Sequence, residues 1–397
     1  MNKYYDRYDS SYYLFNACES GNEAAVKFLL KHGANLKIKD KDNRIALARA
    51  CESGNLHLVK YLIQLGADIN NETNAGDTPL FNACYKGHED IVRYLVEHGA
   101  NIYKVMKNGI TALMEACWSD NLNLIKYLVE HGLYINEKDS DGWTPLLTAC
   151  QEGHEEIVKY LVDHGANINV RNNNGTTPLY IACFNGHITV VKYLEENGVD
   201  INEEANDGWI PLNIACKKGH IIIVKYLVEN GANINKEDND GWTPLYIACK
   251  NGHEDVVKYL VEHGADINKE KVGGWTPIIT ACFNGHITVV KYLVERGADI
   301  NKGDNDGITP LYIACFNGHI TVVKYLVENG ANVNKKNNDG WTFLLIACKE
   351  GHENVVKYLV EHGADINKQD NDGWTPLYIA YQKKKEEIVK YLRSGYK

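Results

Sequence analysis

The prolines of this 397-residue chain recur at a fixed interval. Consecutive prolines are 33 residues or a multiple of 33 apart, and the chain contains eight of them: Pro79, Pro145, Pro178, Pro211, Pro244, Pro277, Pro310 and Pro376. The same register continues through the residues that fill this slot in the other copies, Tyr13, Ala46, Ala112 and Phe343. A period of this length, kept without insertion or deletion, indicates a repeat architecture in which each copy is one supersecondary unit. We therefore expect twelve copies rather than two or three unrelated globular domains.

The cysteines follow the same register. All eleven lie five residues after the proline slot, and only the last copy differs, with Tyr381. Free cysteine often behaves as a small buried apolar residue. Equivalent residues of stacked units lie about 8–10 Å apart, whereas a disulfide needs Cα atoms within about 7 Å. We expect buried, unpaired thiols and no metal site; redox sensing, which needs an exposed thiol, is the alternative.

Residues 141–173 show the local structure that one copy predicts. Thr144 is a favourable N-cap and Pro145 suits the first position of a helix. Gly153 ends this short helix, and an amphipathic second helix follows that ends at Gly165. The residues after it run extended into the next turn. The predicted unit is a helix, a turn, a second helix and a hairpin-like loop, and neighbouring units share one core.

The segment GWTPLLTACQEGHEEIVKYLVDHGANIN, residues 142–169, resembles the ankyrin repeat consensus. The chain departs from that pattern after T-P-L, where the family's usual histidine is replaced by residues such as Tyr180, Tyr246, Leu147 and Asn213. The resemblance covers essentially the whole chain. It implies an all-α repeat solenoid of twelve stacked 33-residue ankyrin repeats, each a helix-turn-helix with a β-hairpin-like loop. It also implies protein binding rather than catalysis.

The two ends of the chain depart from the repeat pattern. We expect a polar lead-in over residues 1–10, the repeat array over residues 11–392 and a tail over residues 393–397. The last copy replaces the usual Gly-His turn with Lys384-Lys385. Terminal repeats need polar outer faces to stay soluble, so the atypical ends predict capping repeats and a complete array.

Charge and hydropathy exclude several classes of function. The net charge is −10 and the pI about 5.8, which argues against a nucleic-acid-binding protein. No apolar run is long enough for a signal peptide or a membrane helix. Many unpaired thiols are typical of a reducing compartment. We expect a cytoplasmic monomer without cofactor; the nucleus and export into another cell are the alternatives for its location.

Two polar rows recur along the array. Eight histidines share the Gly-His slot, which asparagine fills in other copies, and both residues bond to backbone in turns. We expect them to tie neighbouring loops together rather than to catalyse. A basic residue also fills one slot of every second helix, and an acid often follows four residues later, as Asp163 follows Lys159. Such pairs predict a solvated helix face.

Tryptophan occupies the predicted tip of the hairpin-like loop in half of the copies: Trp143, Trp209, Trp242, Trp275, Trp341 and Trp374. In ankyrin families this slot resembles a partner-facing position on the concave side. Binding to a partner and mutual packing along the row are both open, because tryptophan is a frequent anchor at interfaces and also packs well. The slot six residues after the proline varies freely, and in the family it lies beside the tips.

Three consecutive tips and their neighbours form the most distinctive surface. We predict an aromatic ridge edged by positive charge, made of Trp209, Trp242, Trp275, Lys217, Lys250, Phe283, Ile308 and Phe316. A partner with an acidic segment studded with apolar residues would suit it. The alternative patch surrounds Tyr85 and Trp118. We therefore expect a non-catalytic scaffold or adaptor that binds proteins; the alternatives are a structural spacer and an enzyme, for which we find no catalytic constellation.

Overall fold

A computed structural model describes residues 5–394, with side chains from residue 12 onwards. Helices make up the regular structure of this range, and two isolated β-bridges are the remainder, Val105 to Thr111 and Lys336 to Thr342. The hairpin-like loops are therefore turns rather than strands. Part of the expected lead-in, residues 1–4, and part of the expected tail, residues 395–397, lie outside the described residues.

The chain divides into two compact units, Met1–Asp200 and Ile201–Lys397, which we call unit 1 and unit 2. The helices of unit 1 are α1 (Tyr5–Glu19), α2 (Glu23–Lys31), α3 (Ala46–Ser53), α4 (Leu56–Gln64), α5 (Pro79–Tyr85), α6 (Glu89–Glu97), α7 (Ala112–Ala116), α8 (Leu122–Glu130), α9 (Pro145–Glu152), α10 (Glu155–Asp163), α11 (Pro178–Asn185) and α12 (Ile188–Glu196). Those of unit 2 are α13 (Pro211–Lys218), α14 (Ile221–Glu229), α15 (Pro244–Asn251), α16 (Glu254–Glu262), α17 (Pro277–Asn284), α18 (Ile287–Glu295), α19 (Pro310–Asn317), α20 (Ile320–Glu328), α21 (Phe343–Glu350), α22 (Glu353–Glu361), α23 (Pro376–Gln382) and α24 (Glu386–Ser394).

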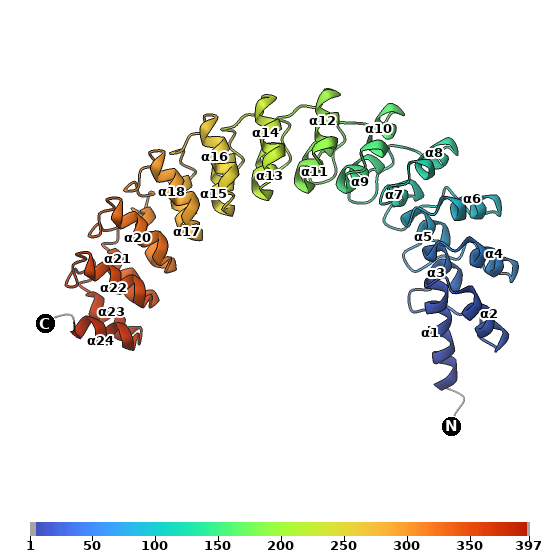
Figure 1. The fold of residues 1–397 in the computed structure, drawn as a ribbon, viewed down its shortest axis with the longest axis horizontal. Helices are drawn as coiled ribbons and strands as arrows, with labels where there is room; N and C mark the ends of the chain where they lie inside the picture. Colours follow the sequence, from blue (N-terminus) through green and yellow to red (C-terminus); the bar gives the residue numbers. More distant parts are fainter. Residues whose placement is uncertain (1–4, 395–397) are drawn as a thin grey trace. The chain divides into compact units, whose positions relative to one another are not determined.

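Each unit is a stack of six helix pairs (Figure 1). The first helix of a pair packs against the first helix of the next pair, as α15 does against α17. The second helices also follow one another, as α16 and α18 do. The twelve pairs match the twelve copies of the 33-residue period, so the predicted repeat solenoid is confirmed.

The repeat that contains α15 and α16 shows why these residues form these helices. The Thr243 hydroxyl accepts a hydrogen bond from the Tyr246 backbone N–H at 3.3 Å, and Pro244 fills the first helical position. Gly252 ends α15 with a left-handed φ of 75°. Gly264 lies beyond the end of α16, where φ is 95°. The predicted caps are therefore confirmed.

The core runs between the helices of each stack. All eleven cysteines are buried and unpaired, as predicted. In the repeat of Cys249, the buried core also includes Leu245, Ala248 and Val257. Burial raises the pKa of the Cys249 thiol above its usual range, which keeps it protonated and unreactive.

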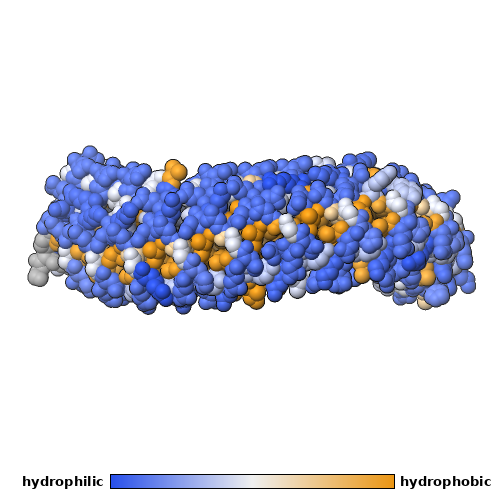
Figure 2. Space-filling model, turned by 90° about the horizontal axis from the view of Figure 1, so that it is seen from above, coloured by the Kyte–Doolittle hydropathy of each residue, from blue (hydrophilic) through white to orange (hydrophobic). Residues whose placement is uncertain are grey.

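Figure 2 shows one face on which hydrophobic side chains form a narrow band between hydrophilic rows within each unit.

We expect few thiols to react while the protein is folded. A thiol-specific reagent should label less than about one in ten of them within minutes, and all of them after unfolding in guanidinium chloride, because only the thiolate of an exposed cysteine reacts quickly. Mass spectrometry of the labelled chain measures the fraction. Rapid labelling of most thiols without denaturant would contradict the buried arrangement.

No helix in residues 5–394 is both long enough and apolar enough to cross a membrane.

Candidate functional site

Each tip of unit 2 is the turn just before a proline slot, and an acid or amide usually shapes it. The Asp238 carboxylate accepts hydrogen bonds from the backbone N–H groups of Asp240 and Trp242, at 2.9 and 2.8 Å. Asp304 does the same for the N–H of Ile308, at 2.8 Å. These bonds place the backbone of the tip residue whatever side chain it bears. Ala205 and Lys271 replace the acid in the tips of Trp209 and Trp275. In all four tips, however, the carbonyl oxygen of the tip residue accepts a hydrogen bond from the backbone N–H four residues before it, at 2.9 to 3.1 Å, so the backbone of the slot is held in each of them.

Two predicted lysines lie over predicted tryptophans. The Lys217 ammonium is 5.0 Å from the centroid of the Trp209 ring, and Lys250 is 3.9 Å from that of Trp242. Both lysines are exposed and both rings are half-buried. A cation at such a distance is attracted by the face of the ring. The structure therefore brings these four residues together in two equivalent pairs.

The apolar members of the predicted ridge continue in the next two repeats. The rings of Trp275 and Phe283 are in contact, with centroids 5.7 Å apart and planes inclined by 58°. Phe283 is 40% exposed and Phe316 is 37% exposed, whereas Ile308 is half-buried. Among the described residues, Phe316 contacts no other aromatic ring. Phe316 and Ile308 thus extend the apolar surface beyond the contacting rings of Trp275 and Phe283.

The tryptophan rings do not pack on one another. In residues 12–394 no two of them are in contact, and Trp242 and Trp374 instead contact tyrosines of their own repeats, Tyr246 and Tyr378. The centroids of Trp242 and Tyr246 are 5.3 Å apart. The described residues therefore show no ring-on-ring packing between tryptophans of neighbouring tips.

Lys271 is a member of the cluster that the sequence analysis missed. Its ammonium lies 5.1 Å from the Trp242 ring, 5.6 Å from Tyr246 and 5.9 Å from Trp275. Its position in the sequence could have revealed it, because it departs from the repeat pattern. Six residues before the proline slot, the other copies of unit 2 have Asp, Asn or Ala, and only this copy has Lys. We call Trp209, Lys217, Trp242, Lys250, Lys271 and Trp275 the cationic ridge.

The lysines of the cationic ridge have no acidic partner. None of Lys217, Lys250 and Lys271 forms an ion pair with a carboxylate among the described residues, whereas the neighbouring Lys236 and Lys269 are each 2.6 Å from a glutamate. Desolvation, followed by the charges of Lys271 and Lys217, lowers the pKa of the Lys250 ammonium. The ridge is therefore a local concentration of uncompensated positive charge on an acidic protein.

The histidines of the Gly-His slot connect successive repeats. In unit 2, His253 donates its Nε2–H to the carbonyl oxygen of Lys217 at 2.9 Å, and His286 does so to that of Lys250 at 3.1 Å. In unit 1, His88 makes the corresponding bond to Glu52 at 3.1 Å, whereas Asn55 connects the repeats through a different carbonyl, that of Gly21, at 2.8 Å. The predicted structural role is confirmed. The carbonyls that receive these bonds in unit 2 belong to the groove slot, six residues after the proline.

The basic row on the second helices does not pair as predicted. Lys159 is 2.6 Å from Glu155, four residues before it, and not paired with Asp163, four residues after it. A glutamate N-terminal to its lysine is the more favourable order in a helix. Asp163 instead accepts a hydrogen bond from Tyr193 of the next repeat, at 3.5 Å. The row is a solvated face, but the prediction of which acid it pairs with was wrong.

The alternative patch lies in unit 1. The rings of Tyr85 and Trp118 are 6.2 Å apart, and both are more than 40% exposed. An open cavity of about 220 Å³ lies between Trp118 and Trp143. Close by, burial and then the charge of Asp77 raise the pKa of Glu115 to about 7. The patch has aromatic surface, but it lacks a cluster of cations over its rings.

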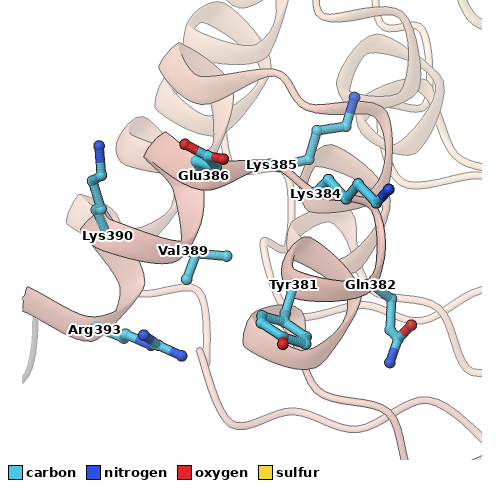
Figure 3. Close-up of a pocket in the computed structure, with 8 residues that line it drawn as sticks. All are labelled: Tyr381, Gln382, Lys384, Lys385, Glu386, Val389, Lys390 and Arg393. Atoms are coloured by element: carbon cyan, nitrogen blue, oxygen red, sulfur yellow. The ribbon is translucent and has the colours of Figure 1, made fainter.

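A further open cavity, of about 530 Å³, lies on the last repeat (Figure 3). Its walls come from α23, α24 and the turn between them, and include Tyr381, Lys384, Lys385 and Arg393. Tyr381 fills the slot that buried cysteine occupies in the other copies, and it is 63% exposed. These surfaces correspond to those that pack against a following repeat elsewhere in the stack, so the cavity is explained by the end of the described stack.

Within the described residues, no group of three or more His, Cys, Asp or Glu side chains is arranged to hold a metal ion.

Comparison with known proteins identifies the repeat. A family model described as ankyrin repeats in three copies matches residues 2–73, 70–139, 133–205, 195–271, 267–337 and 334–397. The fold is similar to the crystal structure of the human ASB11 ankyrin repeat domain, with a TM-score of 0.51 and 30% sequence identity over 55% of this chain and 98% of that one. Among curated proteins, none matches the chain.

Proposed function

Because the chain belongs to the ankyrin repeat family, we propose that it binds a partner protein through the cationic ridge and the adjoining Phe283, Ile308 and Phe316. It acts as an adaptor or scaffold without catalysing a reaction. The eleven unpaired thiols favour a reducing compartment such as the cytoplasm, where we expect a monomer.

One observation supports this surface above the others. The cationic ridge holds three lysines without acidic partners against aromatic rings that remain partly exposed. Many lysines elsewhere on the array instead pair with carboxylates, as Lys159 does, or lie over tyrosines of the next repeat, as Lys225 does. Repulsion among the three lysines and the exposure of the aromatic rings to solvent are both unfavourable in the isolated protein. A bound partner would relieve both effects. Aromatic anchors inside a polar rim are typical of protein interfaces.

The ridge is also well prepared for binding. Its backbone is held by the tip hydrogen bonds and by the histidines of the following repeats, as His286 holds Lys250. A surface that is already ordered loses little conformational entropy when a partner docks. The side chains, rather than the backbone, then determine which partner binds.

The test replaces Trp209, Trp242 and Trp275 together with alanine and measures capture of partners from native lysate. We expect loss of the captured partner, because truncation of one interface anchor typically costs about 2 kcal/mol or more. Helical content and thermal midpoint should stay nearly unchanged, since these rings are only half-buried.

The matched control replaces the three other tryptophans of the tip slot, Trp143, Trp341 and Trp374, which lie outside the ridge. It should keep the partner. If the first variant instead retains the partner but loses stability, the ridge tryptophans are structural. The patch at Tyr85 and Trp118 would then be the next candidate.

A further inference from the structure

We propose that the cationic ridge binds a segment of the partner that is extended in the polyproline II conformation and has an acidic side chain at every third residue. This inference rests on the proposed function and specifies the chemistry of the occupant.

The positive charge of the cationic ridge determines the charge of the segment that binds to it, which must be negative. Lys217, Lys250 and Lys271 lie close enough together for the charges of the other two to lower the pKa of Lys250. No carboxylate of the described chain neutralises them. The tip that begins at Lys271 also lacks the aspartates of its neighbours: it reads Lys-Val-Gly-Gly where the preceding copy reads Asp-Asn-Asp-Gly. Carboxylates from outside the chain are the groups that would relieve this repulsion.

The repeat determines the spacing of those carboxylates. Lys217 and Lys250 fill the same slot in successive repeats, 33 residues apart, and each lies over the tryptophan of its own tip. Packed helices of neighbouring repeats are separated by about 8–10 Å. A polyproline II segment advances about 3.1 Å per residue with three residues per turn, so every third side chain points the same way at intervals of about 9 Å. Two acids three residues apart therefore meet Lys217 and Lys250 from one face of the segment.

Other backbone conformations fit the ridge less well. In a β-strand, side chains on one face are two residues apart, which is about 6.6 Å, and the third residue points to the opposite face. In a helix, acids seven residues apart would match the spacing, but they would project from a cylinder about 10–12 Å wide. A polyproline II segment is thin, and its flat proline rings dock well against aromatic faces such as those of Trp209 and Trp242.

Trp242 offers a further contact. Its indole N–H is covered and donates to no acceptor in the structure, and the ammonium groups of Lys250 and Lys271 lie near the same ring. A donor left without an acceptor is unfavourable. A carboxylate that draws either lysine aside would also supply an acceptor for this N–H.

The experiment titrates the full chain with four fluorescent peptides that contain equal numbers of glutamates. The first repeats Glu-Pro-Ala, the second has the same residues shuffled, the third alternates Glu with Thr, and the fourth is a helical peptide with glutamates seven residues apart. We expect the first peptide to bind at least about tenfold more tightly than the others, a difference that total charge alone does not produce. NMR of the lysine side chains should show the pKa of Lys250 rising on binding.

The charge-reversal variant replaces Lys217, Lys250 and Lys271 with glutamate, and it should weaken binding of the Glu-Pro-Ala peptide by about thirtyfold or more. Its matched control is Lys349→Glu. Lys349 lies over Trp341 at the same 5.0 Å as Lys217 over Trp209, but the groove slots of the adjacent copies hold Phe316 and Gln382 rather than lysine. The control should change binding by less than about twofold.

Every outcome decides the proposal. Equal affinity for all four peptides means unspecific attraction, and preference for the alternating or helical peptide means a different conformation; either result overturns the inference, as does the absence of binding. Capture of the partner from lysate, as described for the tryptophan variant, separates the proposed binding surface from the proposed acidic segment. If it is lost on substitution of the three tryptophans but kept by the charge-reversal variant, the binding surface stands and the acidic occupant is wrong.

Discussion

A chain without residues 241–273 is expected to fold and to lose its partner at the same time. The deletion removes one full period of 33 residues and joins Asp240 to Gly274, which restores the Asp-Gly-Trp-Thr-Pro order of an intact tip. Stacked repeats interact mainly with their neighbours, so a stack one repeat shorter still buries its core. The deletion also removes Trp242, Lys250 and Lys271, the centre of the cationic ridge. Circular dichroism and capture of the partner measure the two effects.

The control deletes residues 340–372, another full period, and joins Asp339 to Gly373. This variant keeps the cationic ridge and should keep both the fold and the partner. A deletion of residues 241–256, which is out of register, should unfold much of unit 2. If both in-register deletions lost their helical signal, the repeats would not be the independent stacking units that the periodicity indicates.

Gly252→Ala should destabilise the protein by about 3 kcal/mol, whereas Gly264→Ala should cost only about 1 kcal/mol. Both glycines have a left-handed φ, 75° and 95°, which alanine adopts with strain. Only Gly252 is also confined: a Cβ there would lie 2.6 Å from Nδ1 of His286, while nothing lies within 4 Å of a Cβ at Gly264. Displacing His286 would also break its bond to the Lys250 carbonyl.

Chemical denaturation of the two alanine variants in parallel measures the free energy of unfolding that each one loses. Backbone strain is common to both variants, so the difference between the two losses is the cost of crowding against His286. Equal losses would mean that the histidine adapts at no cost, and that the contact between successive turns contributes little to stability. A His286→Asn variant gives a further comparison, because asparagine fills this slot at Asn55 and Asn121 and there bonds to a glycine carbonyl of the preceding repeat.

The fold was predictable because every copy contains the same local signals. Threonine or a similar cap, proline at the first helical position and glycine at the helix end recur in one register, so a weak signal in one copy is reinforced by the others. The buried cysteines were predictable for the same reason. A residue type kept in eleven copies at one slot reflects a shared packing requirement.

The candidate surface was predictable only in part. The tryptophan tips and the lysines beside them could be paired because they occupy fixed slots of one repeat. Lys271 could not, because its surroundings come from rings of two different repeats and the length and direction of its side chain decide which rings it reaches. The partner of Lys159 was mistaken because the acids on both sides of it satisfy the same spacing, and only the order along the helix separates them.

The connection between successive turns has a consequence for how recognition can change. His286, His319 and His352 each bond to the main-chain oxygen of a groove residue in the preceding repeat, which is Lys250, Phe283 and Phe316 respectively. The bond is to the peptide group, so it survives any replacement of the side chain at that position. Lysine, phenylalanine and glutamine already alternate there among the copies. Specificity can therefore be rewritten one repeat at a time, in nature or in the laboratory, while the framework that displays it is left intact.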